Sequence, residues 1–465
     1  MPVKTRFAPS PTGLMHLGNA RTALLSALAG NSFLLRIEDT DLERSREEFV
    51  AELLEDLRWM GLQWEEGPAS PKADPAYFQS RRTEIYQRYY EDLEQQGLAY
   101  FCFCSPQELE ISRKVQLGSG RPPRYSGKCA RMTRDEVAER LRQGTRPTLR
   151  FRVPQNEVIE FEDGVRGPQR FSSDDIGDFI IRRADGTPAF FFCNAVDDAL
   201  MGVTLVLRGE DHLTNTPRQL MILKALGLPI PSYAHISLIV GDDGAPLSKR
   251  NGSRSIHQLR AEGYFPSALV NMLARLGHHY ENDQLLPLAR LSAAFDLGRL
   301  GKSPARFDLA HLNHWQELAA RQADDETLWH WLHVETRAIV PKAQRSSFLE
   351  IVRSNCVFPH DAEQWAKVLF ADGMLRDAEV ASVAERAGER FFLAAIDAAD
   401  AHPHDCAAFL SDLKSRSGAK GKHLFMPLRA ALTGRLDGPE LARVYELMDT
   451  PRIQRRLAEF TYVSE

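Results

Sequence analysis

Two short segments of this chain carry residues suited to binding phosphate. Residues 9–19 place His16 and Gly18 where an apolar run gives way to a helix, and residues 246–250 form a basic loop containing Lys249. The start of a helix offers unpaired N–H groups and partial positive charge, and glycine lets an anion approach the backbone closely. A lysine can stabilise the charge that develops at a phosphate under attack. Each signal alone is weak, because a single histidine of this kind is equally a surface or capping residue.

Together the two segments resemble the HIGH and KMSKS signatures of class I aminoacyl-tRNA synthetases, which activate an amino acid with ATP. Residues 35–41 resemble the RIEDTD segment of the glutamyl and glutaminyl enzymes, as do residues 206–212 with 215–219. Similarity to bacterial glutamyl-tRNA synthetases covers nearly the whole chain, strongly to about Trp315 and more loosely beyond it. The resemblance implies ligation of L-glutamate to the 3′ end of tRNA-Glu, with ATP and Mg²⁺.

The resemblance also assigns roles to individual residues. Arginine binds carboxylates with planar bidentate geometry, which suits Arg6 and Arg208, whereas Glu38 would accept the α-amino group. A structural ion pair with Glu38 or Asp211 is the alternative for both arginines. The implied glutamate contacts are Arg6, Ser10, Glu38, Asn194 and Arg208. The implied ATP contacts are Thr12, His16, Gly18, Asn19, Glu210 and Lys249, of which His16 and Lys249 are the candidate catalytic residues.

Two positions depart from the family pattern. Phe190 stands where the family usually has tyrosine, so a hydroxyl that could bond the substrate is missing. Such a bond contributes about 0.5–1.5 kcal/mol. Pro246 stands where the basic loop usually begins with lysine, whereas the lysine that resembles the ATP contact is retained as Lys249.

Three cysteines resemble the zinc knuckle of some bacterial glutamyl-tRNA synthetases. Cys102 and Cys104 form a Cys-x-Cys pair, and Cys129 follows. Arg131 occupies the position where many of those enzymes have a histidine ligand, and arginine cannot ligate zinc. Tyr125 could supply the fourth ligand, as in shortened relatives with a Cys-x-Cys…Tyr-x3-Cys arrangement. A metal-free, reduced site is the alternative.

The choice of tRNA is expected to depend on the helical C-terminal part. Family members that reject tRNA-Gln resemble one another in an arginine that reads the third anticodon base, and that position falls on Asn355 here. Asparagine is shorter and both donates and accepts hydrogen bonds, so we expect relaxed or altered anticodon choice that includes tRNA-Gln. The alternative is an alignment two residues away, in which Arg353 reads the base.

Alternating strands and helices are expected to position these residues. Residues 3–8 and 32–37 read as buried strands, 20–28 as a helix, and 47–60 as an amphipathic helix. This alternation predicts a parallel α/β sheet with the nucleotide beyond the carboxyl ends of its strands. Short strands are expected over 149–153, 158–161 and 179–182.

The whole chain is predicted to be a multidomain protein in which an α/β part is followed by an all-α part. We expect a Rossmann-like class I catalytic domain, an inserted acceptor-binding subdomain and a C-terminal α-helical anticodon-binding region. The expected boundaries are 1–96 and 188–240 for the two catalytic halves, 97–187 for the insertion, 241–321 for the stem-contact region with the basic loop, and 322–465 for the anticodon-binding region.

Composition is consistent with this reading but does not identify the function. The chain has 465 residues, a formal net charge of −5 and six cysteines, and no apolar run reaches the length of a membrane span. These features favour a cytoplasmic protein, expected to be a monomer, that binds RNA through local basic faces. Two alternatives stay open: a relative that glutamylates a modified tRNA base, and an RNA-binding protein on a retired synthetase scaffold.

Overall fold

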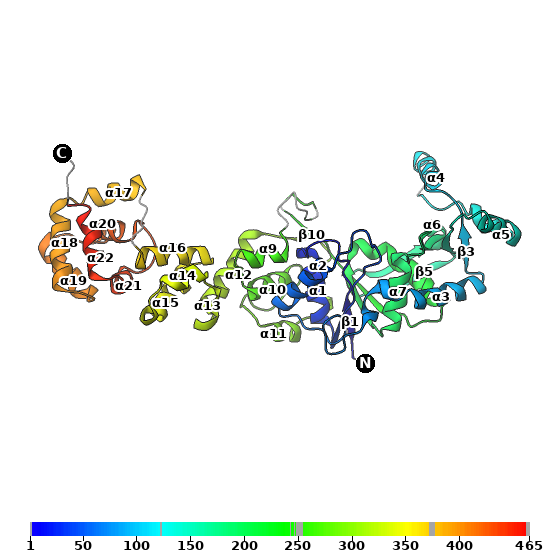
Figure 1. Ribbon diagram of the computed structural model, residues 1–465, viewed down its shortest axis with the longest axis horizontal. Helices are drawn as coiled ribbons and strands as arrows, with labels where there is room; N and C mark the ends of the chain where they lie inside the picture. The colour runs from blue at the N-terminus through cyan, green and yellow to red at the C-terminus, as the bar shows by residue number, and fades with distance from the viewer. Residues whose placement is uncertain are drawn as a thin grey trace. The chain divides into compact units, whose positions relative to one another are not determined.

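The computed structural model describes residues 2–120, 123–241, 243–245, 247, 254–371 and 377–461. It divides into two compact units (Figure 1). The first comprises residues 1–261 and 269–311, and the second comprises residues 262–268 and 312–465. The mixed sheets of the first unit and the helical second unit confirm the predicted fold class.

Parallel strands form the centre of the first unit. Strand β1 (Lys4–Phe7) pairs in parallel with β2 (Ser32–Leu35), and β8 (Leu205–Gly209) pairs in parallel with β9 (Ser232–Ile236). The amide of Thr204 donates to the carbonyl of Lys4 at 2.9 Å, which ties β8 to the edge of β1. The carboxyl ends of these strands therefore lie together, as the alternation predicted.

Residues 97–187, which were predicted to form an inserted subdomain, contribute strands to two different sheets. Its strands β3 (Ala99–Cys102), β4 (Thr148–Phe151) and β7 (Phe179–Arg182) form an antiparallel sheet. The hairpin of β5 (Val158–Asp163) and β6 (Gly167–Ser172) instead extends the sheet of β8 and β9, with β5 parallel to β9. The hairpin therefore brings residues of the insertion next to the catalytic strands. A short ladder of β10 (Ile239–Val240) and β11 (Ala305–Arg306) completes the strands.

Helices cover these sheets where the sequence predicted them. The expected helices over 20–28 and 47–60 are α1 (Leu17–Ala29) and α2 (Glu47–Trp59), and Leu53, Leu57 and Met60 on the predicted apolar face are buried. The remaining helices of the first unit are α3 (Thr83–Gln95), α4 (Pro106–Gly118), α5 (Arg134–Arg142), α6 (Ser173–Ile176), α7 (Phe190–Leu200), α8 (Thr216–Ala225), α9 (Ile256–Ala261) and α11 (Leu288–Ala293), and α10 (Pro266–Arg275) has residues in both units.

The second unit is helical throughout its longer segment. Its core contains the buried aromatic side chains of Phe348, Phe392, Phe409 and Tyr445. The helices are α12 (Leu309–Gln322), α13 (Asp325–Trp331), α14 (Val334–Ile339), α15 (Arg345–Asn355), α16 (Pro359–Phe370), α17 (Ala378–Glu385), α18 (Glu389–Ala401), α19 (Cys406–Ser417), α20 (Lys422–Thr433), α21 (Leu441–Leu447) and α22 (Thr450–Ala458). Across both units, no helix that is described is long and apolar enough to cross a membrane.

Candidate active site

A cavity of about 430 Å³ lies at the carboxyl ends of β1, β8 and β9. It collects the predicted site residues from segments that are far apart in the sequence. Of the predicted glutamate and ATP contacts, those that line it are Arg6, Ser10, Thr12, His16, Gly18, Asn19, Glu38, Asn194 and Arg208. Residues that the sequence did not single out also line it, among them Arg21, His212 and Ser237.

The start of α1 forms one wall of the cavity. His16 is the N-cap residue with extended backbone geometry, and Gly18 lies in the first turn. Apart from its chain neighbours and the backbone of its own helix, the nearest atom that a Cβ at Gly18 would meet among the described residues is His16 Nδ1, at 3.9 Å. Glycine here is therefore not required by packing within the protein, and the open space suits close approach of a phosphate to the helix terminus.

Two described residues near Lys249 in the sequence, Leu247 and Ser255, lie beside this wall. Lys249 and Pro246 lie outside the described residues. Leu247 lines the cavity, and its amide donates to the carbonyl of Ile239 at 3.1 Å. On the other side, Ser255 forms an antiparallel bridge with His16. Both ends of the segment that contains Lys249 are therefore attached beside the predicted phosphate site.

The two predicted carboxylate-binding arginines have different charge environments. Arg6, 4% exposed, pairs with Asp198: Nε lies 3.2 Å from Oδ1 and Nη2 lies 3.3 Å from Oδ2. Arg208, 5% exposed, has no carboxylate within 4.0 Å among the described residues, and its Nη1 has no hydrogen-bond partner there. Arg6 thus has an ion pair, although with Asp198 and not with Glu38 or Asp211, whereas the described residues offer Arg208 no ion-pair partner within this distance.

This difference makes Arg208 the stronger candidate for an anionic substrate. Burial lowers the pKa of the Arg208 guanidinium to about 10, which leaves it charged at neutral pH. A buried guanidinium without a neutralising partner is costly, and a bound carboxylate would offset that cost.

The carboxylate of Glu38 could supply the negative charge that a substrate ammonium group would need. Its Oε1 is 3.4 Å from Nη2 of Arg36 and accepts a hydrogen bond from Nδ2 of Asn194. Burial raises the pKa of Glu38 to about 7, although Arg36 and Arg6 act in the opposite direction. The arrival of an ammonium group would favour the ionised carboxylate, so Glu38 is suited to accept the α-amino group.

Helix α7 supplies two carboxylates that the sequence reading missed, those of Asp197 and Asp198. Asn194, Asp197 and Asp198 share one face because they are spaced three and four residues apart. Asp198 also pairs with Arg36 at 2.8 Å, and Asp197 accepts from Arg82 Nε at 2.7 Å. Consecutive aspartates in an otherwise apolar helix were the available signal, because buried carboxylates require partners.

Two further predicted positions have specific environments. Glu210 does not line the cavity; its carboxylate pairs with Arg166 and accepts from the amide of Leu238 at 3.0 Å. Phe190 lines the cavity and stacks on His212 with ring centroids 5.2 Å apart. Burial lowers the pKa of His212 to about 4, so this pair is neutral near pH 7.

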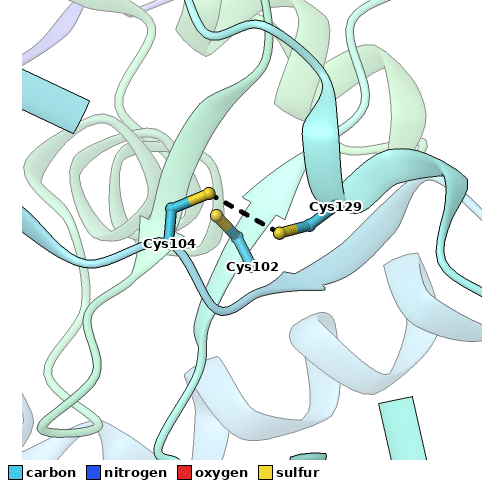
Figure 2. A group of neighbouring side chains, drawn as sticks. All are labelled: Cys102, Cys104 and Cys129. Carbon is cyan, nitrogen blue, oxygen red and sulfur yellow. Dashed lines mark hydrogen bonds between the residues drawn. The ribbon is translucent and has the colours of Figure 1, made fainter. Parts of the chain in front are cut away.

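The three predicted zinc-knuckle cysteines come together in the inserted segment. Their sulfur atoms all lie within 4.8 Å of one another, and Figure 2 shows Cys102 and Cys104 facing Cys129. The hydroxyl oxygen of Tyr125 lies 3.4 Å from Sγ of Cys102 and 3.5 Å from Sγ of Cys104. This group of three thiols and one phenol could hold a metal ion.

The two anticodon candidates lie on α15 with different partners. Arg353 Nη2 donates to Oδ1 of Asp325 at 2.7 Å and to the carbonyl of Ala323 at 3.1 Å. Asn355 Nδ2 donates to the carbonyl of Ile351, one turn earlier, at 2.9 Å. Both side chains are half-buried and already engaged, so either could take part in base recognition only through its remaining groups.

Comparison with known proteins gives two matching family models and close relatives. Residues 2–314 match the family "tRNA synthetases class I (E and Q), catalytic domain", and residues 326–461 match "Anticodon binding domain". The chain is 71% identical to glutamate–tRNA ligase 1 of Methylococcus capsulatus over 100% of this chain and 99% of that protein. It is 57% identical to glutamate–tRNA ligase 2 of Nitrosococcus oceani over 98% and 97%.

A solved structure extends this similarity to the whole fold. A glutamate tRNA ligase from Elizabethkingia meningosepticum, in complex with its amino acid, is similar with a TM-score of 0.88 and 26% identity, covering 99% of each chain. The chain belongs to the class I tRNA synthetases of the E and Q type, as the sequence resemblance predicted.

Proposed function

We propose that this protein is a glutamate–tRNA ligase. It activates L-glutamate with ATP and transfers the product to the 3′ end of tRNA-Glu. The observation that carries the proposal is the cavity in which Arg208 lies with Glu38 and the start of α1, with no carboxylate of the described residues within 4.0 Å of the Arg208 guanidinium. Together they offer a cation for a carboxylate, an anion for an ammonium and a helix terminus for phosphate.

The chemistry proceeds in two displacements. An oxygen of the glutamate α-carboxylate attacks the α-phosphorus of ATP, and the bond to the β-phosphate breaks with release of pyrophosphate. A hydroxyl of the terminal ribose of tRNA then attacks the acyl carbon of glutamyl-adenylate, which releases AMP. The protein contributes positioning and charge stabilisation: Arg208 and Glu38 hold glutamate, whereas His16 and Lys249 act on the phosphates. Mg²⁺ accompanies ATP as part of the substrate.

Exchange of pyrophosphate into ATP, measured with glutamate in the presence and absence of tRNA, tests this function. We expect exchange that requires tRNA. Exchange without tRNA would favour the relatives that glutamylate a modified base, although the helical unit of this chain argues against them. If no exchange occurs with or without tRNA, the protein would instead be an RNA-binding protein with a synthetase fold and no synthetase activity. We further infer a cytoplasmic monomer, in which residues 241–321 contact the tRNA stem and residues 322–465 read the anticodon.

We predict that the protein charges tRNA-Gln as well as, or instead of, tRNA-Glu, because asparagine replaces the discriminating arginine at position 355. Aminoacylation of the two purified tRNAs side by side measures this directly. The variant Asn355→Arg should shift the ratio of charging towards tRNA-Glu by about 5- to 150-fold, which is the range for one good base contact. Strict charging of tRNA-Glu that is abolished by Arg353→Ala and untouched by Asn355→Ala would assign the reading to Arg353 instead.

We also propose that Cys102, Cys104, Cys129 and Tyr125 hold one zinc ion. Thiolates and a phenolate in this arrangement fit the tetrahedral, sulfur-rich coordination that zinc prefers, and the ion would tie β3 to the segment around Cys129. The guanidinium of Arg150 lies over the Tyr125 ring at 3.9 Å, which holds the phenol beside the thiols.

Elemental analysis of protein purified without chelator should give about one zinc per chain. Cys129→Ser should reduce that content strongly, because zinc would lose one of three thiolates. Cys406→Ser, at a buried cysteine of α19 in the helical unit, is the matched control and should retain the metal. A wild-type content near zero would reject the site and leave the proposed ligase activity unaffected.

A further inference from the structure

A buried hydrogen-bond chain joins the β5–β6 hairpin to Arg208. It begins at Asp163, the last residue of β5, whose Oδ2 lies 2.5 Å from Nδ1 of His235. The other carboxylate oxygen, Oδ1, accepts the backbone N–H groups of Val165, Arg166 and His235 at 3.0, 2.8 and 3.1 Å. Asp163 is therefore held rigidly, and one of its oxygens is committed to the His235 ring.

The far side of the His235 ring contacts Arg208. Nε2 of His235 lies 3.1 Å from Nε of Arg208 and 3.1 Å from Oγ1 of Thr216, and Nη2 of Arg208 donates to the same Oγ1 at 2.8 Å. His235 and Thr216 are fully buried, and His235 is the register partner of Arg208 across the parallel β8–β9 pair. Two of the three guanidinium nitrogens of Arg208, Nε and Nη2, are thus held in position by hydrogen bonds.

These contacts permit one protonation state of His235. Nδ1 carries the proton and donates it to Asp163, so Nε2 accepts from Arg208 and from the Thr216 hydroxyl. A proton on Nε2 would point at the N–H of Arg208 and break the arrangement. Burial lowers the pKa of His235 and the charge of Arg208 lowers it further, against the raising effect of Asp163, which is consistent with a neutral ring.

We propose that Asp163 and His235 are positioning residues that orient Arg208 for the carboxylate of the amino-acid substrate. The remaining guanidinium nitrogen, Nη1, has no partner among the described residues, and Arg208 lines the cavity. The inserted hairpin thereby contributes to amino-acid binding without touching the substrate. This inference rests on the proposed glutamate–tRNA ligase function, and it adds a determinant of glutamate affinity to that function.

Asp163→Asn tests the proposal through the His235 tautomer. The asparagine carbonyl can keep the three backbone N–H bonds, which places its NH₂ group against Nδ1 of His235. Turning the amide around would instead leave three buried donors without an acceptor, so the proton of His235 is expected to move to Nε2. The KM for glutamate should then rise about 10- to 100-fold, the range for a hydrogen bond to a charged group, with kcat and the KM for ATP close to wild type.

A pair of His235 variants separates positioning from packing. His235→Gln places an amide oxygen near the position of Nε2 and should retain most of the affinity for glutamate, whereas His235→Leu fills the space without an acceptor and should match Asp163→Asn. If His235 had a purely structural role, both variants would change the KM for glutamate by a similar factor. Glu160→Gln is the matched control, because Glu160 lies on the same strand but is exposed at its surface and pairs with exposed Arg170.

The outcomes distinguish this inference from the function on which it rests. Charging of tRNA with glutamate by the wild-type protein is measured in the same assay. If the wild type does not charge tRNA, both the proposed function and this inference are overturned. If the wild type is active, an unchanged KM for glutamate in Asp163→Asn and His235→Leu overturns the inference alone. Should Asp163→Asn fail to fold by thermal unfolding, the His235→Gln and His235→Leu pair decides: equal KM values reject the proposal.

Discussion

Replacing Arg208 by lysine should reduce kcat/KM for glutamate by roughly 100- to 1,000-fold, because the bidentate contact of a guanidinium with a buried substrate carboxylate is lost. Lysine retains the charge but lacks the planar fork that reaches His235, Thr216 and a substrate carboxylate together. The loss should therefore fall mainly on the KM for glutamate in the charging assay, whereas the KM for ATP should change little.

Arg88→Lys provides the control for Arg208→Lys. Arg88 lies on the exposed face of α3, so the same chemical change there should leave both KM values unchanged. A lysine variant at position 208 with an unchanged KM for glutamate would mean that the substrate carboxylate binds elsewhere. Arg6 would then be the remaining candidate, despite its ion pair with Asp198.

Lys249→Ala should reduce the rate of glutamate activation by about 100-fold or more, because one preorganised charge at a developing anion is typically worth that much. Leu247, two residues before Lys249, lines the cavity, and Ser255, six residues after it, bridges His16, which supports the assignment of Lys249 to the phosphate site. The measurement is pyrophosphate exchange with saturating glutamate and tRNA.

Two controls accompany the Lys249 variant. Thermal unfolding should match wild type, since the change is expected to affect the reaction and not the fold. Lys224→Ala removes a lysine from the exposed end of α8 and should retain full exchange activity. Exchange near the wild-type rate in Lys249→Ala would show that the basic loop has been misassigned.

Much of the catalytic region could be predicted from sequence because its signals are local. His16 and Gly18 lie within one helical turn, and a helix terminus binds anions wherever it occurs. The strands over 3–8 and 32–37 were predicted within three residues of their ends, since buried parallel strands read as apolar runs. The grouping of the three cysteines was expected from their resemblance to a zinc knuckle, and the structure brings their sulfur atoms together.

The insertion was predicted less completely. The sequence reading named short strands there but did not foresee that β5 and β6 would extend the sheet of β8 and β9. Strand partners depend on contacts between segments far apart in the chain, and the alternation of side chains within one strand does not specify them. For the same reason, Asp163 was not predicted to lie beside His235.

The sequence by itself therefore determined the class of protein and many of the residues that line the candidate active-site cavity, because those residues occur in short contiguous motifs. Tertiary structure alone decided which arginine keeps its charge available. Arg6 and Arg208 are the same residue type on neighbouring strands, yet Asp198 on α7 neutralises the first, whereas neutral His235 and Thr216 hold the second. Charge compensation depends on distances of a few ångströms between groups remote in sequence, and only the folded chain establishes those distances.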